Sequence, residues 1–121
     1  MCGFVGLYLN NNYNIEVRKL VSILNNMTNT LAHRGPDNKD IYINEKEKLA
    51  FGFQRLSIID LKTSANQPMI SRNNDWVIIF NGEIYNYKKL KEKLKRKKNY
   101  WRSNSDSEVA LECISKYGFF N

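Results

Sequence analysis

A cysteine stands directly after the first methionine, at the start of the string MCGFVG. If Met1 is removed, Cys2 becomes the N-terminal residue and carries both a thiol nucleophile and a free α-amine. The amine can act as the general base for the thiol, because an unperturbed α-amine has a pKa of about 7.7–8.0 and is partly neutral near pH 7. This pair is suited to acyl transfer without a separate histidine. Chance also explains a cysteine at this position, so the interpretation depends on the other polar residues.

Further polar residues gather where the apolar pattern of the chain breaks. They are His33–Asp37, Arg55–Asp60, Asn81–Glu83 and, at the start of a helical pattern, Asp106. Strand ends and loops are the places where functional sites are usually built. We therefore take these four places, together with Cys2, as candidates for a single site.

Hydrolysis of an amide needs chemical groups that several of these residues supply. The oxyanion of the tetrahedral intermediate needs donors, which the side-chain amide of Asn81 and the backbone N–H of Gly82 can provide. A substrate that is itself an amino acid needs a cation for its carboxylate, and Arg55 can bind one with two hydrogen bonds. Its ammonium group needs an acceptor, for which Asp106 or Glu83 is suited. The set therefore matches the functional groups of glutamine.

Each of these residues also has a purely structural interpretation. Arg55 at a strand end is often a surface ion-pair partner, and Asn81-Gly82 alone is often a hairpin turn. Asp106 is often only a favourable charge at a helix N-terminus, and the His33–Asp37 loop could bond to backbone alone. The order of the whole set along the chain favours the functional interpretation more than any single member does.

Hydrophobic periodicity predicts strands separated by helices. The expected strands are Cys2–Leu9, Asp40–Ile43, Leu49–Ile59 and Trp76–Phe80, and the expected helices are Ile15–Leu31, Tyr85–Lys98 and Asn104–Tyr117. The run WVIIF is apolar and β-branched, which is typical of a central strand. Strands with helices segregated between them indicate an α+β fold.

The last predicted helix carries clear signals at both ends. Ser105 and Glu108 have the spacing of a capping box, and Gly118 is a fitting residue just past the C-terminus. Its buried face is expected at Ala110, Cys113, Ile114 and Tyr117. Cys113 is therefore interpreted as a small core residue rather than a second nucleophile.

The positive charge of the chain comes from one segment. Residues Lys88–Lys98 hold eight basic residues and one acidic residue, which accounts for the whole formal net charge of +7. We interpret this segment as the solvated face of an amphipathic helix, so nucleic acid is not an expected partner. The two cysteines and one histidine, widely spaced, do not predict a metal site or a disulfide framework. Without a signal peptide or a long apolar run, the chain is expected in the cytoplasm, away from membranes.

Six strings, in this order, resemble class II glutamine amidotransferase domains of the N-terminal-nucleophile hydrolase type. The resemblance is strongest to the N-terminal glutaminase domain of glutamine-hydrolysing asparagine synthetases. The strings are MCGFVG, HRGPD, RLSIIDL, NQPM, FNGEIYNY and SDSEVAL. The resemblance implies a four-layer αββα sandwich. Because the further strands and the synthetase domain of the family are absent, we expect an incomplete sandwich, with residues 1–121 as the N-terminal part of a type-2 amidotransferase domain.

The resemblance implies a role for each matched residue. Cys2 would be the nucleophile that forms a glutamyl thioester and releases ammonia, with its own α-amine as the base. Asn81 and Gly82 would form the oxyanion hole. Arg55 would bind the carboxylate of L-glutamine, and Glu83 and Asp106 its amino group. The expected substrate-binding set is Arg55, Leu56, Ser57, Ile58, Ile59, Asn81, Gly82, Glu83 and Asp106.

The resemblance also implies partners. Ammonia would pass to a synthetase domain that aminates an ATP-activated aspartate, although related domains serve other acceptors, and a homodimer remains open. No cofactor or metal is expected in residues 1–121, with ATP and magnesium only in the synthetase domain. The alternative is a catalytically inactive, truncated fragment that acts only as an interaction or assembly module, through sheet edges that pair with another chain.

Overall fold

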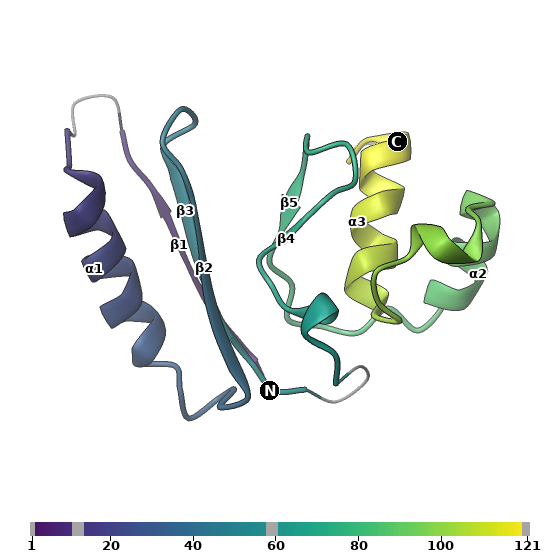
Figure 1. Ribbon diagram of the computed structural model, residues 1–121, viewed down its shortest axis with the longest axis horizontal. Coiled ribbons are helices and arrows are strands. Elements are labelled where there is room, and N and C mark those ends of the chain that lie inside the picture. Colours follow the sequence, from purple (N-terminus) through teal and green to yellow (C-terminus); the bar gives the residue numbers. More distant parts are fainter. Residues whose placement is uncertain (1, 11–13, 58–60, 120–121) are drawn as a thin grey trace. The chain divides into compact units, whose positions relative to one another are not determined.

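The computed structural model describes residues 2–10, 14–57 and 61–119, and the chain divides into two compact units. The first unit comprises Met1–Leu56 and the second Ser57–Asn121, and each is described by itself (Figure 1). The predicted Ile58 and Ile59 lie outside the described residues.

The first unit is built on a three-stranded antiparallel sheet of order β1-β3-β2. Its strands are β1 (Gly3–Tyr8), β2 (Asn38–Asn44) and β3 (Leu49–Arg55). The register pairs Gly3 with Gln54 on one side of β3 and Asn38 with Arg55 on the other. All three strands were predicted, but β3 ends at Arg55 rather than continuing to Ile59 as a strand.

Helix α1 (Val17–Asn29) covers one face of this sheet, as Figure 1 shows. Leu20 and Leu24 of the helix pack with Ala50 of β3 in a buried cluster. The residues packed against this cluster are apolar and partly buried: Val5, Leu7, Leu9, Ile15, Ile41 and Ile43. Burial of each such leucine contributes about 1.5–3 kcal/mol, so the amphipathic pattern of the helix is sufficient to dock it.

Helix and sheet approach closely at Gly52 of β3. A Cβ at this position would lie 1.9 Å from Oγ1 of Thr28, so only glycine fits. Thr28 is fully buried and its hydroxyl donates to the carbonyl of Leu24 at 2.6 Å. The Nε2 of Gln54 in turn donates to the carbonyl of Thr28 at 3.2 Å, which ties the helix end to β3.

The second unit contains a short two-stranded antiparallel sheet of β4 (Met69–Ile70) and β5 (Val77–Ile78), and a 3-10 turn at Thr63–Ala65. The prediction of a central strand over Trp76–Phe80 is wrong for the described residues. Only two of its five residues are in a strand, and β5 pairs with β4 alone. The strand is short because both ends of the run make other hydrogen bonds. Trp76 closes a turn with Ser71, and the backbone of Phe80 is bound by the side chain of Gln67.

The basic helix is shorter than predicted. Helix α2 spans Tyr87–Leu94 and ends at Lys95, which adopts the left-handed conformation at φ 50°. A 3-10 turn over Lys98–Tyr100 then follows. Leu94 is the buried anchor of α2, and the run of lysines after it offers no further apolar residue to continue the helix against the unit.

Helix α3 (Asp106–Tyr117) begins two residues after the predicted start at Asn104, ends at the predicted Tyr117, and has the predicted cap residues. The Ser105 side chain accepts a hydrogen bond from the amide of Glu108, and Gly118 has φ 82°. Its buried face, however, differs from the predicted one. Ala110, Cys113 and Ile114 are only partly buried and Tyr117 is exposed, whereas Glu108, Val109, Leu111 and Glu112 are buried. Glu108 and Glu112, which hydrophobic periodicity would place on the solvent side of the helix, are therefore buried in the unit.

Helices together with antiparallel strands confirm the predicted α+β class. Within the described ranges, no helix is long and apolar enough to cross a membrane.

Candidate active site

Cys2 lies at the start of β1, where the paired strand β3 ends. Its Sγ lies 3.3 Å from the amide nitrogen of Leu56, which donates to it, and 3.6 Å from the carbonyl oxygen of Leu56. The thiol is partly buried. Antiparallel pairing of Gly3 with Gln54 brings the start of β1 to the end of β3, so the strand register places Cys2 near Leu56.

The HRGPD loop holds the backbone of the same residue. The Nε of Arg34 donates to the carbonyl of Cys2 at 3.2 Å. Gly35 runs so close to β3 that a Cβ would lie 2.5 Å from the carbonyl oxygen of Gln54. The amide of Asp37 donates to the carbonyl of Arg55 at 3.0 Å. The sequence marked this loop as polar, but nothing in it indicated that Arg34 contacts Cys2, because the two residues are 32 positions apart.

The predicted carboxylate-binding arginine closes the same strand. Arg55 is the last residue of β3 and is buried, and Leu56 follows it against the thiol. Ser57, the first residue of the second unit, is partly buried. The structure therefore brings Cys2, Arg55 and Leu56 together within the first unit.

Asn81, Gly82 and Glu83 form an exposed loop in the second unit. The loop follows Phe80 directly, and a Cβ on Gly82 would lie 2.8 Å from Cζ of the Phe80 ring. The two residues that flank the loop are both bound by side chains from elsewhere in the unit. Gln67 binds the backbone of Phe80, and Asp106 binds the amide of Ile84.

Asp106 is the first residue of α3 and is buried. Its Oδ2 accepts from the amide of Ile84 at 2.9 Å and its Oδ1 from the amide of Ser107 at 2.9 Å. Asp106 therefore lies at the N-terminus of a helix, as its purely structural interpretation expected. It also binds the residue that follows the loop of the predicted oxyanion donors. The structure brings Asp106 together with Asn81–Glu83 within the second unit.

Buried carboxylates fix the rest of α3. Glu108 accepts from the amide of Ser103 at 2.8 Å and from Nε of Arg102 at 3.2 Å, and Glu112 accepts from the amide of Arg72 at 2.9 Å. The hydroxyl of Tyr100 donates to Glu112, and burial, followed by this carboxylate, raises the pKa of Tyr100. These bonds hold the helix whose first residue contacts the loop.

The second cysteine differs from the first. Cys113 lies on α3, and burial raises the pKa of its thiol, which lowers the fraction present as the nucleophilic thiolate. In the ranges that the structure describes, no three His, Cys, Asp or Glu side chains gather in a group that could hold a metal ion.

Taken separately, each unit holds one part of the expected chemistry. The first holds a thiol beside an arginine at a strand end, and the second holds a loop with amide donors beside a carboxylate. Over residues 1–120 the sequence matches the family described as the glutamine amidotransferase domain. The chain belongs to this family.

Curated relatives agree with this family. The chain is 40% identical over 117 residues to asparagine synthetase (glutamine-hydrolyzing) 1 of Bacillus subtilis, covering 97% of this chain and 18% of the relative. It is 36% identical over 135 residues to a putative asparagine synthetase of Methanocaldococcus jannaschii, covering 98% and 25%, and 32% identical over 105 residues to the amidase chry2 of Gibberella zeae, covering 87% and 16%. This amidotransferase chain thus spans a quarter or less of the length of these relatives.

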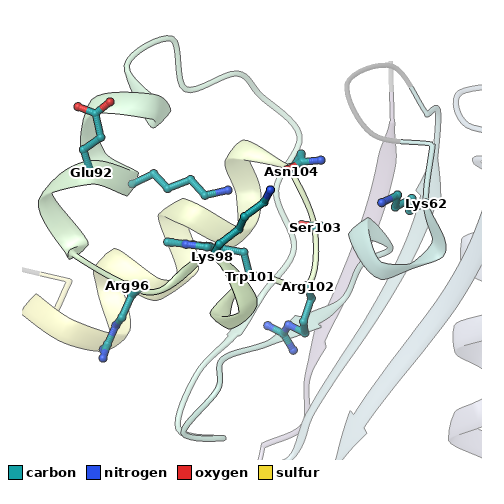
Figure 2. Close-up of a pocket in the computed structure, with 9 residues that line it drawn as sticks. Lys62, Glu92, Arg96, Lys98, Trp101, Arg102, Ser103 and Asn104 are labelled. Atoms are coloured by element: carbon teal, nitrogen blue, oxygen red, sulfur yellow. The ribbon is translucent and has the colours of Figure 1, made fainter.

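A basic pocket of about 530 Å³ also opens on the second unit, lined by none of the predicted site residues (Figure 2). Lys62, Lys91, Arg96, Lys98 and Arg102 line it together with Glu92, Trp101, Ser103 and Asn104. The ammonium of Lys91 lies 4.6 Å from the ring centre of Trp101. Three of the eight basic residues of Lys88–Lys98 therefore line this pocket, and Asn81, Gly82 and Glu83 do not.

Proposed function

We propose that this chain is a glutaminase domain that hydrolyses L-glutamine to L-glutamate and ammonia through a thioester on Cys2. The observation that supports the proposal is the double anchoring of Cys2, by the backbone of Leu56 at its sulfur and by Arg34 at its carbonyl. A nucleophile fixed at both ends is held close to the attacking geometry, which lowers the entropic cost of the reaction. The family match supplies the class of reaction.

The reaction divides into two acyl transfers. After removal of Met1, the α-amine of Cys2 takes the thiol proton as Sγ attacks the side-chain amide carbon of glutamine. The proton passes to the leaving nitrogen, ammonia departs and a γ-glutamyl thioester remains. Water then loses a proton to the same amine and attacks the thioester, which releases glutamate and restores the thiol.

The remaining site residues act on the charges of the substrate. In this proposal Asn81 and Gly82 donate to the oxyanion, and loss of either donor costs about 3–4 kcal/mol of transition-state stabilisation. Arg55 binds the carboxylate of glutamine, and Glu83 and Asp106 accept from its amino group. Leu56, Ser57, Ile58 and Ile59 contribute backbone to the same pocket.

The relatives suggest where the ammonia goes. We propose an ATP-dependent acceptor domain of the asparagine synthetase type, because the relatives named above include glutamine-hydrolysing asparagine synthetases. ATP and magnesium would act in that domain. We also propose that the described strands and helices are part of a four-layer αββα sandwich. The alternative of an inactive assembly fragment is not favoured, since the family match begins at residue 1 and includes Cys2.

The two cysteines of the chain provide a matched test. We expect Cys2→Ala to reduce ammonia release from glutamine to below about one thousandth of the wild-type rate, because no other group replaces the nucleophile. Cys113→Ala should retain the rate, since its thiol lies on α3 and burial raises its pKa, which lowers the thiolate fraction. Intact mass measurement should show loss of Met1. Wild-type ammonia release from Cys2→Ala, or an active protein that retains Met1, would contradict the mechanism.

A further inference from the structure

Gln67 continues the β4–β5 ladder with its side chain. The register pairs Met69 with Ile78, and two residues further along it places Gln67 opposite Phe80. There the Oε1 of Gln67 accepts from the amide of Phe80 at 2.6 Å, and its Nε2 donates to the carbonyl of Phe80 at 3.2 Å. The carboxamide thus binds Phe80 as a peptide group of a neighbouring strand would.

The same carboxamide reaches the start of α3. Its Nε2 also lies 3.3 Å from Oγ of Ser107, the residue after Asp106. Asp106 accepts from the amide of Ser107 through one carboxylate oxygen and from the amide of Ile84 through the other. A run of hydrogen bonds therefore leads from Phe80 through Gln67, Ser107 and Asp106 to Ile84, and the backbone of residues 81–83 closes it into a ring.

The loop of residues 81–83 is the part of the chain that this ring spans. Both flanking residues are fixed through their backbone, at Phe80 by Gln67 and at Ile84 by Asp106, while the three loop residues remain exposed. A loop fixed at both ends has few backbone conformations, so its amide groups point in defined directions. Such preorganisation is what oxyanion donors require, because they must be aimed before charge develops.

We propose that Gln67 is a positioning residue for the oxyanion donors Asn81 and Gly82. The inference rests on the proposed glutaminase function and extends it to a buried residue outside the predicted site. Gln67 is 6% exposed, so its carboxamide acts through Phe80 rather than on the substrate. Asp106 has the complementary role at the other end of the loop, in addition to its proposed contact with the substrate amino group.

Only a carboxamide satisfies all three partners at this position. Methionine has a similar length but neither donates nor accepts effectively, so it leaves both backbone groups of Phe80 without this partner. Glutamate retains the acceptor and loses the donors, which places a carboxylate against the carbonyl of Phe80. A protonated glutamate regains one donor, so lowering the pH should partly restore the loop in Gln67→Glu.

The test combines amide hydrogen exchange with glutaminase kinetics on Gln67→Met and Gln67→Glu. We expect the amide of Phe80 to exchange at least about tenfold faster in Gln67→Met, and kcat to fall about 10–100-fold with KM for glutamine changed less than about threefold. In Gln67→Glu the ratio of variant to wild-type kcat, measured at the same pH, should rise as the pH is lowered.

Tyr100→Phe is the matched control in the same unit. It removes a partly buried hydrogen bond to α3 at Glu112, more than a helical turn from Asp106, and should leave kcat and the exchange of Phe80 within about twofold of wild type. An unchanged kcat in both Gln67 variants overturns the proposal. So does an equal fall in Tyr100→Phe, or the unfolding of both Gln67 variants while Tyr100→Phe stays folded, because each outcome assigns Gln67 to general stability.

The two proposals fail in different ways. If Cys2→Ala releases ammonia like the wild type, the catalytic mechanism is wrong, and the exchange of the Phe80 amide still decides whether Gln67 holds the loop. If Cys2→Ala is inactive while both Gln67 variants keep the wild-type kcat, the function stands and the role of Gln67 is wrong.

Discussion

The two units are stabilised in different ways. In the first unit an amphipathic helix packs on a three-stranded sheet, and the buried cluster consists of Leu20, Leu24 and Ala50. In the second unit the helix with the most buried residues, α3, points Glu108 and Glu112 inward, where they are 0% and 2% exposed. The second unit also buries apolar side chains such as Leu94, Val109 and Leu111, but it adds buried carboxylates that need matched donors.

This difference matters because the two kinds of core respond differently to change. Apolar packing is non-directional, so a residue of similar size replaces another at modest cost. A buried carboxylate must be paired in detail, and removing it leaves its donors buried and unpaired. In the second unit this network also fixes α3, whose first residue, Asp106, binds the residue that follows the 81–83 loop.

The largest effect that follows from this comparison is expected at Glu108. Glu108→Met should destabilise the protein by about 3–5 kcal/mol, although it conserves volume, because the amide and hydroxyl of Ser103 and the guanidinium of Arg102 lose their acceptor. Leu24→Met, a volume-conserving change in the apolar cluster, should cost less than about 1.5 kcal/mol. Urea unfolding measures both. Equal losses for the two substitutions would show that the cores do not differ in kind.

A smaller effect is expected where the first unit is packed most tightly. Gly52→Ala should destabilise the protein by about 1–3 kcal/mol, because the added Cβ would lie 1.9 Å from Oγ1 of the buried Thr28. Thr28→Ala removes that oxygen, so the double variant should lose less stability than the sum of the two single losses. A double-mutant cycle by urea unfolding measures this coupling. Additive losses would mean that the helix moves away from the strand in Gly52→Ala, so that the new Cβ does not contact Thr28.

The same contrast explains what the sequence could predict. Apart from the end of β3, the first unit was predicted with bounds within two residues of the observed ones, because α1 and the three strands follow simple hydrophobic periods. In the second unit the run WVIIF predicted a central strand, yet only Val77–Ile78 is a strand. The last residue of the run, Phe80, binds the side chain of Gln67, which lies 13 positions away. Hydrophobic periodicity cannot predict such a bond.

The candidate site shows a similar limit. Cys2 could be chosen by chemical type, because the chain has only two cysteines, whereas Arg55 and Asp106, among 19 basic and 12 acidic residues, also needed the resemblance of their strings to the family. Gln67 was not chosen, and Arg34 was included only as part of the His33–Asp37 loop without a role, although both lie in strings that resemble the family. Each acts on a backbone carbonyl or amide, and such contacts depend on the fold rather than on the spacing of reactive side chains.

The smallest effect concerns the edge of the carboxylate network at high pH. Burial and Glu112 raise the pKa of Tyr100 above its ordinary value of 10.0, so the folded protein keeps the phenol protonated where the unfolded chain begins to ionise. The stability from this residue is therefore fully present below pH 10 and is lost as the pH rises through the folded pKa. Urea unfolding of the wild type should show a decline above pH 10 that is shallower in Tyr100→Phe. If the two declines are equal, the hydroxyl of Tyr100 is not coupled to Glu112 in solution, and the network that distinguishes the second unit does not extend to this residue.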